Sequence, residues 1–161
     1  MSDEKAAATE SVNEQQFLIQ RVYLKDLSFE APMGAKAFIS KVQPSVDQEL
    51  ATETTKIDTD LYEVVLKLTV TAKIEDDAAF LVEVHQAGLF FIKGIEGADL
   101  TRVINTVCPE ILFPYAREAI DSSLIKGSFP PVMLPPVNFG ALFGQAMAEK
   151  QTQAEKAAQP H

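Results

Sequence analysis

The feature that most constrains this chain is the alternation of apolar and polar side chains in DLYEVVLKLTVTAK, residues 60–73. Even positions from Tyr62 to Ile74 are apolar, whereas most odd positions are polar. This period of two predicts a strand with one buried and one wet face, which is typical of an antiparallel sheet. The acidic segment 75–77 then turns the chain into a second strand over 78–92, which predicts a hairpin with a loop of about three residues.

Two further segments have strand character. Residues 17–31 are rich in Val, Tyr and Phe and alternate near their end, so we expect a third strand there. A weaker fourth strand is predicted over 45–51, where apolar and acidic positions alternate. Between these two, residues 32–44 are interrupted by Pro and Gly, which indicates a long crossover loop over the sheet surface.

Helical patterns follow the strands. The sequence predicts helices over 99–107 and 109–126, and Gly127 stands where a helix C-cap is expected. Pro114 lies inside the second helix and should kink or restart it, because proline cannot donate the backbone hydrogen bond.

A proline-rich segment separates these helices from the end of the chain. Residues 128–137 hold four prolines and should be extended, with Asn138 placed to cap a final short helix. The apolar residues of that helix fall on one stripe. They are Phe139, Leu142, Phe143, Ala146 and Met147.

Both ends of the chain differ from the middle. The first 16 residues hold four acids and one lysine, and residues 145–161 are rich in Ala, Gln, Glu and Lys. Such segments have too little apolar surface to bury. We therefore expect a disordered acidic tail over 1–16, one folded domain over 17–144 and a flexible tail over 145–161.

Charge and hydropathy narrow the possible partners and location. The chain has 14 Lys+Arg against 23 Asp+Glu, a formal net charge of −9, which disfavours nucleic acid and anionic lipid and favours basic or uncharged partners. No apolar run approaches the ~20 residues of a membrane-spanning helix, and the acidic start does not resemble a signal peptide. We expect a cytoplasmic protein without direct membrane insertion, and its single cysteine agrees with a reducing compartment.

The residues needed for common catalytic sites are scarce. The two histidines are His85, on the polar side of a predicted strand, and His161, in the tail. One cysteine and one histidine outside the tail cannot form a zinc site within one chain. Cys108 precedes Pro109 at a helix start, where it is either a packed small apolar residue or a somewhat activated thiol. Paired carboxylates are plentiful, so a hydrolytic enzyme with a general acid/base dyad remains an alternative, although no motif supports it.

Acidic residues share a face on two predicted strands. Asp26 and Glu30 are four positions apart, about 13 Å along a strand, which is too far for a catalytic pair but suits an extended binding strip. Leu81 and Glu83 share a face opposite to that of Phe80, Val82 and Val84. If the two strands lie in one sheet, Asp26, Glu30, Leu81 and Glu83 form an acidic patch with an apolar anchor for a basic partner.

Apolar residues outside the periodic strands are a second candidate site. They either cover the sheet or line an apolar groove between two movable covers that takes an unfolded chain. A few side chains worth ~1.5–3 kcal/mol each would suffice for weak, sequence-tolerant capture. The candidates are Phe38, Val42, Val46, Phe139, Leu142 and Phe143. A carrier of a small apolar ligand is a further alternative.

Five segments match one known family in its order and cover nearly everything between the tails. They are QRVYLKDLSFEAP (20–32), YEVVLKLTVTA (62–72), FLVEVHQAGLF (80–90), CPEILFPYARE (108–118) and PPVNFGALF (135–143). In these segments the chain resembles the SecB family of bacterial protein-export chaperones. The combination of ILFPYARE and PVNF is the most specific part of the resemblance.

The resemblance implies a fold, an activity and partners. The fold is an α+β subunit with a four-stranded antiparallel sheet, assembled into a homotetramer that is a dimer of dimers. The activity is that of an ATP-independent holdase, with no cofactor and no enzymatic reaction, which passes non-native precursor proteins to the SecA ATPase. Family positions for the zinc-binding C-terminal tail of SecA fall on Asp26, Glu30, Leu81 and Glu83. A related chaperone with a toxin-linked antitoxin client is the nearest alternative.

Overall fold

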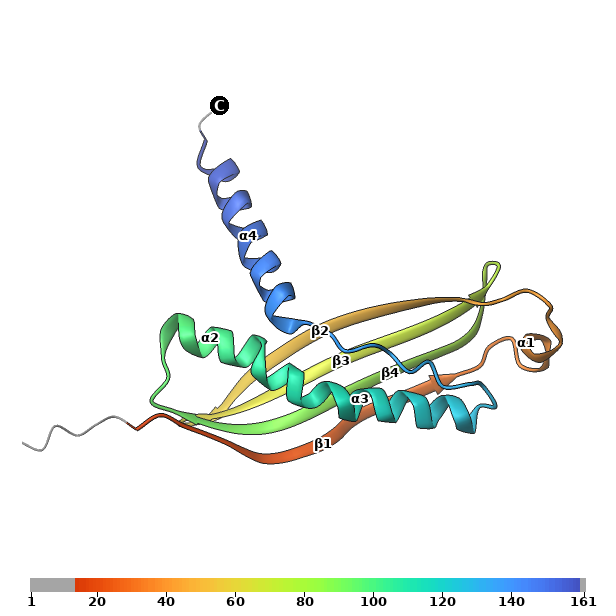
Figure 1. The fold of residues 1–161 in the computed structure, drawn as a ribbon, viewed down its shortest axis with the longest axis horizontal. Coiled ribbons are helices and arrows are strands. Elements are labelled where there is room, and N and C mark those ends of the chain that lie inside the picture. Colours follow the sequence, from red (N-terminus) through yellow and green to blue (C-terminus); the bar gives the residue numbers. More distant parts are fainter. Residues whose placement is uncertain (1–13, 160–161) are drawn as a thin grey trace, which may run out of the picture.

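The computed structural model describes residues 14–159. The elements follow the chain as β1 (Gln16–Glu30), α1 (Ala35–Ile39), β2 (Ser45–Asp58), β3 (Leu61–Ile74), β4 (Asp77–Lys93), α2 (Gly97–Asn105), α3 (Val107–Lys126) and α4 (Phe139–Ala157). The strands form one antiparallel sheet in the order β1-β4-β3-β2. Figure 1 shows α2 and α3 on one face of this sheet, while α4 projects away from it.

The predicted alternation sets the two faces of the sheet. We call the side covered by α3 the inner face; even-numbered residues of β3, and those of β4 from Phe80 onward, lie on it and the odd-numbered ones lie on the outer face. Leu66 and Leu68 of β3 are fully buried there, as are Leu112 and Ile120 of α3. The predicted strand pattern is confirmed, and the core lies between α3 and the two central strands.

The register of β1 depends on an irregularity near Lys25. Leu24 is paired with Gln86 on the inner face, but the next paired residue, Asp26, is opposite His85 on the outer face. The extra residue changes the face to which the following side chains point, as β-bulges do. This shift brings Asp26 and Glu30 to the outer face.

Several predicted boundaries need correction. The hairpin between β3 and β4 has two loop residues, Glu75 and Asp76, rather than three. Glu75 adopts a φ of 58°, which a tight two-residue turn requires. The crossover 32–44 contains the short helix α1, and β2 continues seven residues beyond the predicted end at 51.

The two predicted helices before the proline-rich segment are present, with shifted ends. α3 runs without interruption through Pro114, so the predicted restart is wrong. Gly127 is the C-cap as predicted, but its φ of −84° is not left-handed. Glycine is needed for space, because a Cβ there would lie 2.4 Å from Cζ of Phe29.

The segment between α3 and α4 is extended, as predicted, and side chains of α3 hold it in place. The Asp121 carboxylate accepts hydrogen bonds from the backbone N–H groups of Val132 (3.0 Å) and Met133 (3.3 Å). Arg117 Nη1 donates to the carbonyl oxygen of Leu134 at 3.4 Å. These contacts lead the chain back along the body to the start of α4 (Figure 1).

The ends of the chain differ from the prediction where they are described. Asn138 caps α4 as predicted, its Oδ1 accepting from Ala141 N at 2.9 Å. The helix is not short, however, and the segment expected to be a tail from residue 145 is helical up to Ala157. Of the acidic tail predicted over 1–16, residues 1–13 lie outside the described residues, and Gln16 already belongs to β1.

Candidate functional site

The outer face of the sheet brings the four predicted acidic-patch residues together. Glu30 of β1 is the register partner of Leu81 of β4, and Ser28 is that of Glu83. Asp26 follows one row further along. Asp26 and Glu30 are exposed and Leu81 and Glu83 half-buried, so the four side chains form one accessible surface. We call Asp26, Glu30, Leu81 and Glu83 the acidic strip.

Further charged residues adjoin the acidic strip. Nε2 of His85 lies 3.0 Å from Oε1 of Glu83. Lys67 of β3 is the register partner of His85 and forms an ion pair with Glu53 of β2, with 2.7 Å between Nζ and Oε1. The hydrogen bond and the charge of Lys67 lower the pKa of Glu53. Acidic and basic groups therefore continue across all four strands.

A second polar cluster lies further along the outer face. Glu63 of β3 accepts hydrogen bonds from the hydroxyl of Tyr23 and from Nζ of Lys25, the latter at 2.7 Å. These bonds, first that from Lys25, lower the pKa of Glu63. Burial, followed by the bond to Glu63, raises the pKa of Tyr23 to about 12. The cluster ties the bulged part of β1 to β3 across the intervening strand β4.

The predicted groove residues fall into two groups, the first near α1. Phe38 stacks on Phe129 with ring centroids 5.1 Å apart, and Phe129 also packs on Phe80 at 5.0 Å. Phe38 is nonetheless 54% exposed. Val42 and Val46, in the crossover and at the start of β2, are about half exposed. This end of the sheet therefore presents apolar surface to solvent.

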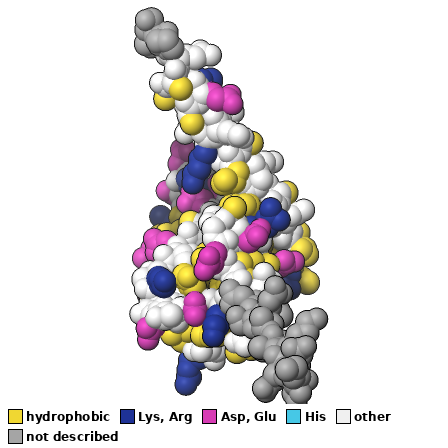
Figure 2. Space-filling view, turned by 90° about the vertical axis from the view of Figure 1, so that its left-hand side faces the viewer, with side chains coloured by type: hydrophobic (Ala, Val, Ile, Leu, Met, Phe, Trp, Pro, Cys, Tyr) yellow, Lys and Arg dark blue, Asp and Glu magenta, His cyan; other side chains and the backbone are white. Residues whose placement is uncertain are grey.

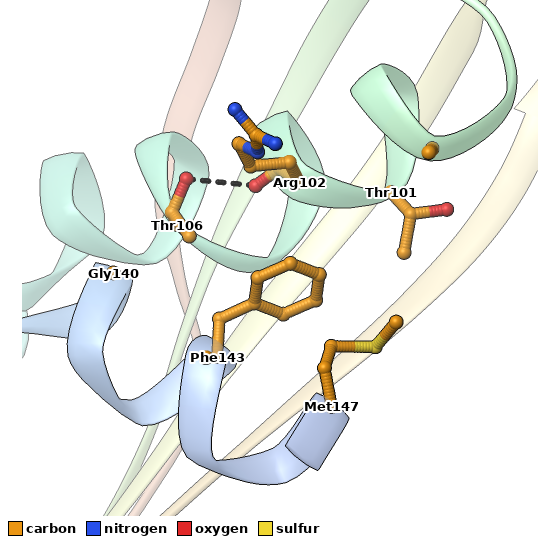
Figure 3. A pocket seen from close by; sticks show the side chains of 8 residues that line it. Thr101, Arg102, Thr106, Gly140, Phe143 and Met147 are labelled. Atoms are coloured by element: carbon orange, nitrogen blue, oxygen red, sulfur yellow. Dashed lines mark hydrogen bonds between the residues drawn. The ribbon is translucent and has the colours of Figure 1, made fainter. Parts of the chain in front are cut away.

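The second group lies on α4. Figure 3 shows Phe143 and Met147 pointing from α4 toward α2, opposite Thr101 and Arg102. The hollow between the two helices has a volume of about 550 Å³, and three of the residues that line it are small: Ala98, Gly140 and Gly144. Leu142 is 46% exposed. Figure 2 shows hydrophobic side chains where α4 leaves the body.

Phe139 differs from the other groove candidates, because it belongs to the core. It is 5% exposed and packs edge-on against Phe113 of α3, with centroids 6.1 Å apart. A smaller hollow of about 180 Å³ lies between α4 and β2, and Phe139 lines it together with Leu50, Leu142 and Phe143. In the structure Phe139 anchors the start of α4, and its neighbours Leu142 and Phe143 face open space.

The inner side of β2 connects the two groups. Val46 and Leu50 point to the inner face, opposite Ala72 and Leu68. They are separated by about 13 Å along the strand. α3 packs on β4 and β3, so most of β2 is left exposed. The candidates thus form two apolar ends of one open, strand-lined surface rather than a closed cavity.

The remaining candidates for chemistry can be placed as well. Cys108 is fully buried, and burial raises the pKa of its thiol to about 12, so the packed apolar alternative describes it. Residues 14–159 contain no group of three or more His, Cys, Asp or Glu side chains able to hold a metal ion. Among the helices of the same residues, none is long and apolar enough to span a membrane.

Sequence reasoning missed two parts of these surfaces. Asp47 and Glu49 of β2 share the outer face with the acidic strip, and their alternation with Val46 and Leu50 was the available signal. Arg102 and Met147 line the hollow between α2 and α4. No local pattern shows this hollow, because it depends on how two distant helices are placed.

The architecture defines an α+β protein of the SecB-like chaperone fold. A solved structure of a SecB-like chaperone from Mycobacterium tuberculosis, in complex with a peptide from the HigA1 antitoxin, matches with a TM-score of 0.62. The match covers 75% of this chain and 90% of that chain at 16% identity, so it concerns the fold.

Sequence comparison then gives the family. The model of the preprotein translocase subunit SecB matches residues 10–150. Curated proteins named protein-export protein SecB are 56% identical in Cellvibrio japonicus, covering 96% of this chain and 94% of the relative, and 54% identical in Saccharophagus degradans, covering 92% and 89%. The chain belongs to the SecB family of protein-export chaperones.

Proposed function

We propose that this protein is an ATP-independent holdase of the cytoplasm that binds non-native precursor proteins, keeps them competent for translocation and delivers them to the SecA ATPase. The observation that carries the proposal is the separation of two surfaces. Exposed apolar side chains lie beside the start and the middle of β2, and the acidic strip lies on the opposite face of the sheet. Client and SecA could then be bound at the same time.

The client surface suits an unfolded polypeptide. β2 is an edge strand in the order β1-β4-β3-β2, so its free backbone groups can pair with an extended chain whatever its sequence. Phe38 near the start of β2 and Leu142 and Phe143 beside its middle offer apolar contacts to alternate client side chains. Several such surfaces in one assembly would raise the effective concentration of weak contacts.

Capture of a denatured precursor tests the client surface. We expect Leu142→Gln to weaken capture by about fivefold, because an apolar contact is lost. Ile57→Gln is the matched control: Ile57 is similarly exposed at the far end of β2, and its replacement should leave capture unchanged. Competition with native and denatured forms of one precursor gives the readout. Equal effects of both variants, or equal binding of native protein, would contradict the proposal.

The acidic strip suits the basic, zinc-binding C-terminal tail of SecA. Asp26, Glu30 and Glu83 supply negative charge along two neighbouring strands, and Leu81 lies beside Glu30 at the end of the strip as an apolar contact. Exposed charges mainly steer association and are screened by salt. Binding should therefore be fastest at low ionic strength.

A binding experiment with the isolated SecA tail tests the docking proposal. Asp26→Asn and Glu83→Gln should each reduce the association rate at low salt, and the difference from the unmodified protein should shrink at high salt. Glu110→Gln is the control, since Glu110 is exposed on α3, away from the outer face. Unchanged tail binding in the Asp26 and Glu83 variants would place the docking surface elsewhere.

The proposed homotetramer, a dimer of dimers, has suitable contact surfaces. β1 is the other edge strand and exposes Leu18, Ile19 and Leu24, which favours pairing with a second copy. On α3, Tyr115 and Ile125 are more than half exposed on the side away from the sheet. Light scattering at micromolar concentration should give the mass of four chains. A monomer would contradict this part of the proposal.

The relatives also bear on the choice of client. The SecB-like chaperone bound to an antitoxin peptide is 16% identical to this chain, whereas protein-export relatives reach 56%. This difference favours precursor proteins as the clients.

A further inference from the structure

His85 is placed at the centre of the charged outer face. Its Nε2 lies 3.0 Å from Oε1 of Glu83, a member of the acidic strip. Its register partner on β1 is Asp26, a second member of the strip. The side chain of His85 is 22% exposed, so the ring is accessible to protons while packed among its neighbours.

Charged groups reach His85 from every neighbouring strand. β4 contributes Glu83, and β1 contributes Asp26 and the adjacent Lys25, whose Nζ is bonded to Glu63. β3 contributes Lys67, the other register partner. β2 contributes Glu53, which is bonded to Lys67 and near enough to interact with the charge of His85. The ring is therefore flanked by acids of the strip on one side and by an ion pair on the other.

We propose that His85 is a positioning residue of the acidic strip and makes its binding of a basic partner depend on pH. This inference rests on the docking proposal above. Imidazole is the side chain whose charge ordinarily changes between pH 5 and 8. When His85 is neutral, Glu83 and Asp26 present uncompensated negative charge to the partner. When His85 is protonated, its charge pairs with Glu83, and the strip loses part of its attraction for a cation.

The sign of the effect follows from linkage. A cationic partner disfavours the protonated ring, so binding should release a proton at intermediate pH and weaken as the pH falls. A single exposed charge pair is worth little, so we expect binding about two- to fivefold weaker at pH 6 than at pH 8. The effect should be lost at high salt, since the groups involved are near solvent.

The test uses the full-length protein and a synthetic peptide of Arg, Leu and Ser with blocked ends. Such a peptide does not titrate in this range, whereas zinc ligands would. The affinity is measured from pH 6 to pH 8 at low salt, and proton release is measured by calorimetry in buffers of different ionisation enthalpy. His85→Gln should bind as tightly at pH 6 as at pH 8, without releasing a proton. His85→Lys, with a permanent charge, should bind weakly throughout.

Two controls keep the outcomes distinct. His161→Gln removes the other histidine of the chain and should retain the pH dependence of the unmodified protein. Thermal unfolding shows whether the His85 variants remain folded. If Glu83→Gln weakens binding at pH 8 but the pH profile is the same with and without His85, the inference about His85 is wrong and the docking proposal stands. Binding that is unaffected by Glu83→Gln overturns the docking proposal together with it.

Discussion

The two faces of the sheet are built from the same strands and differ in what their side chains do. On the inner face, residues such as Val64, Leu66 and Leu68 are completely buried against α3. On the outer face, the odd-numbered neighbours form hydrogen bonds and ion pairs near solvent, as Glu63 and Lys67 do. Burial of apolar area contributes far more to folding than exposed ion pairs do. The inner face therefore supplies stability, and the outer face is free to serve recognition.

The largest expected effect distinguishes the faces at adjacent positions. Leu68→Ala should lower the free energy of unfolding by about 2–5 kcal/mol, because it leaves a cavity between Leu50 and Val84 in a core that cannot fully collapse. Thr69→Ala, one residue further on and facing outward, should change it by less than about 0.5 kcal/mol. Denaturant unfolding at fixed protein concentration measures both. Similar losses in the free energy of unfolding for the two variants would contradict the difference between the two faces.

A second prediction concerns the tight packing of the inner side. Gly127→Ala should destabilise by about 1–3 kcal/mol, since the new Cβ would lie 2.4 Å from the ring of Phe29. Gly144→Ala is the control on α4, where a Cβ meets nothing within 4 Å. There alanine should raise stability by up to about 1 kcal/mol through helix propensity. A neutral Gly127→Ala variant would show that Phe29 moves freely.

The alternation of apolar residues was sufficient to predict these two faces. In β3 and β4 every predicted inner residue lies inward, because a period of two leaves one choice of face once the core is known. In β1 the apolar positions change from even, at Val22 and Leu24, to odd, at Leu27 and Phe29. That change is the sequence signal of the bulge at Lys25, and it explains why the acidic strip could be assembled from residues alone.

The parts that were mispredicted depend on tertiary contacts or on weak local signals. α4 continues to Ala157 although no apolar stripe extends beyond Met147, so composition alone could not distinguish a solvated helix from a tail. Phe139 is largely buried by its contact with Phe113 of α3, which no local pattern indicates, and it also lines the hollow beside Leu142, so its role in the groove stays a prediction. The position of α4 relative to α2, which creates the hollow near Phe143, follows from the course of the proline-rich segment held by Asp121.

The third prediction tests how much an outer-face cluster adds to stability. Glu63→Gln should cost about 1–2 kcal/mol at pH 7, because the charged hydrogen bond to Lys25 is lost while Tyr23 keeps an acceptor. The pKa of Glu63 is lowered by folding, so its contribution is present in full above the ordinary value of 4.5. The contribution is lost as the pH falls through the lower pKa of the folded state.

Unfolding curves at several pH values check this dependence. The two proteins should differ at neutral pH and converge under acidic conditions. A difference that persists at low pH would mean that the shape of the side chain, rather than its charge, supports the bulge of β1.

The smallest effect on folding is expected for a substitution of Lys67. This substitution best separates the role of the outer face in binding from that of the inner face in stability. Lys67→Met breaks the ion pair with Glu53, whose side chain is 65% exposed, so the midpoint of denaturant unfolding should not change measurably. The same variant removes a positive charge next to His85 and the acidic strip. Binding of the basic peptide at low salt should therefore become about twofold tighter, an effect that salt abolishes. Lys126→Met, at the end of α3, changes the net charge equally and should leave binding unaltered. An equal gain in affinity in both variants would mean that the net charge of the molecule sets the binding. A gain in Lys67→Met alone would mean that the position of the lysine on the outer face sets it.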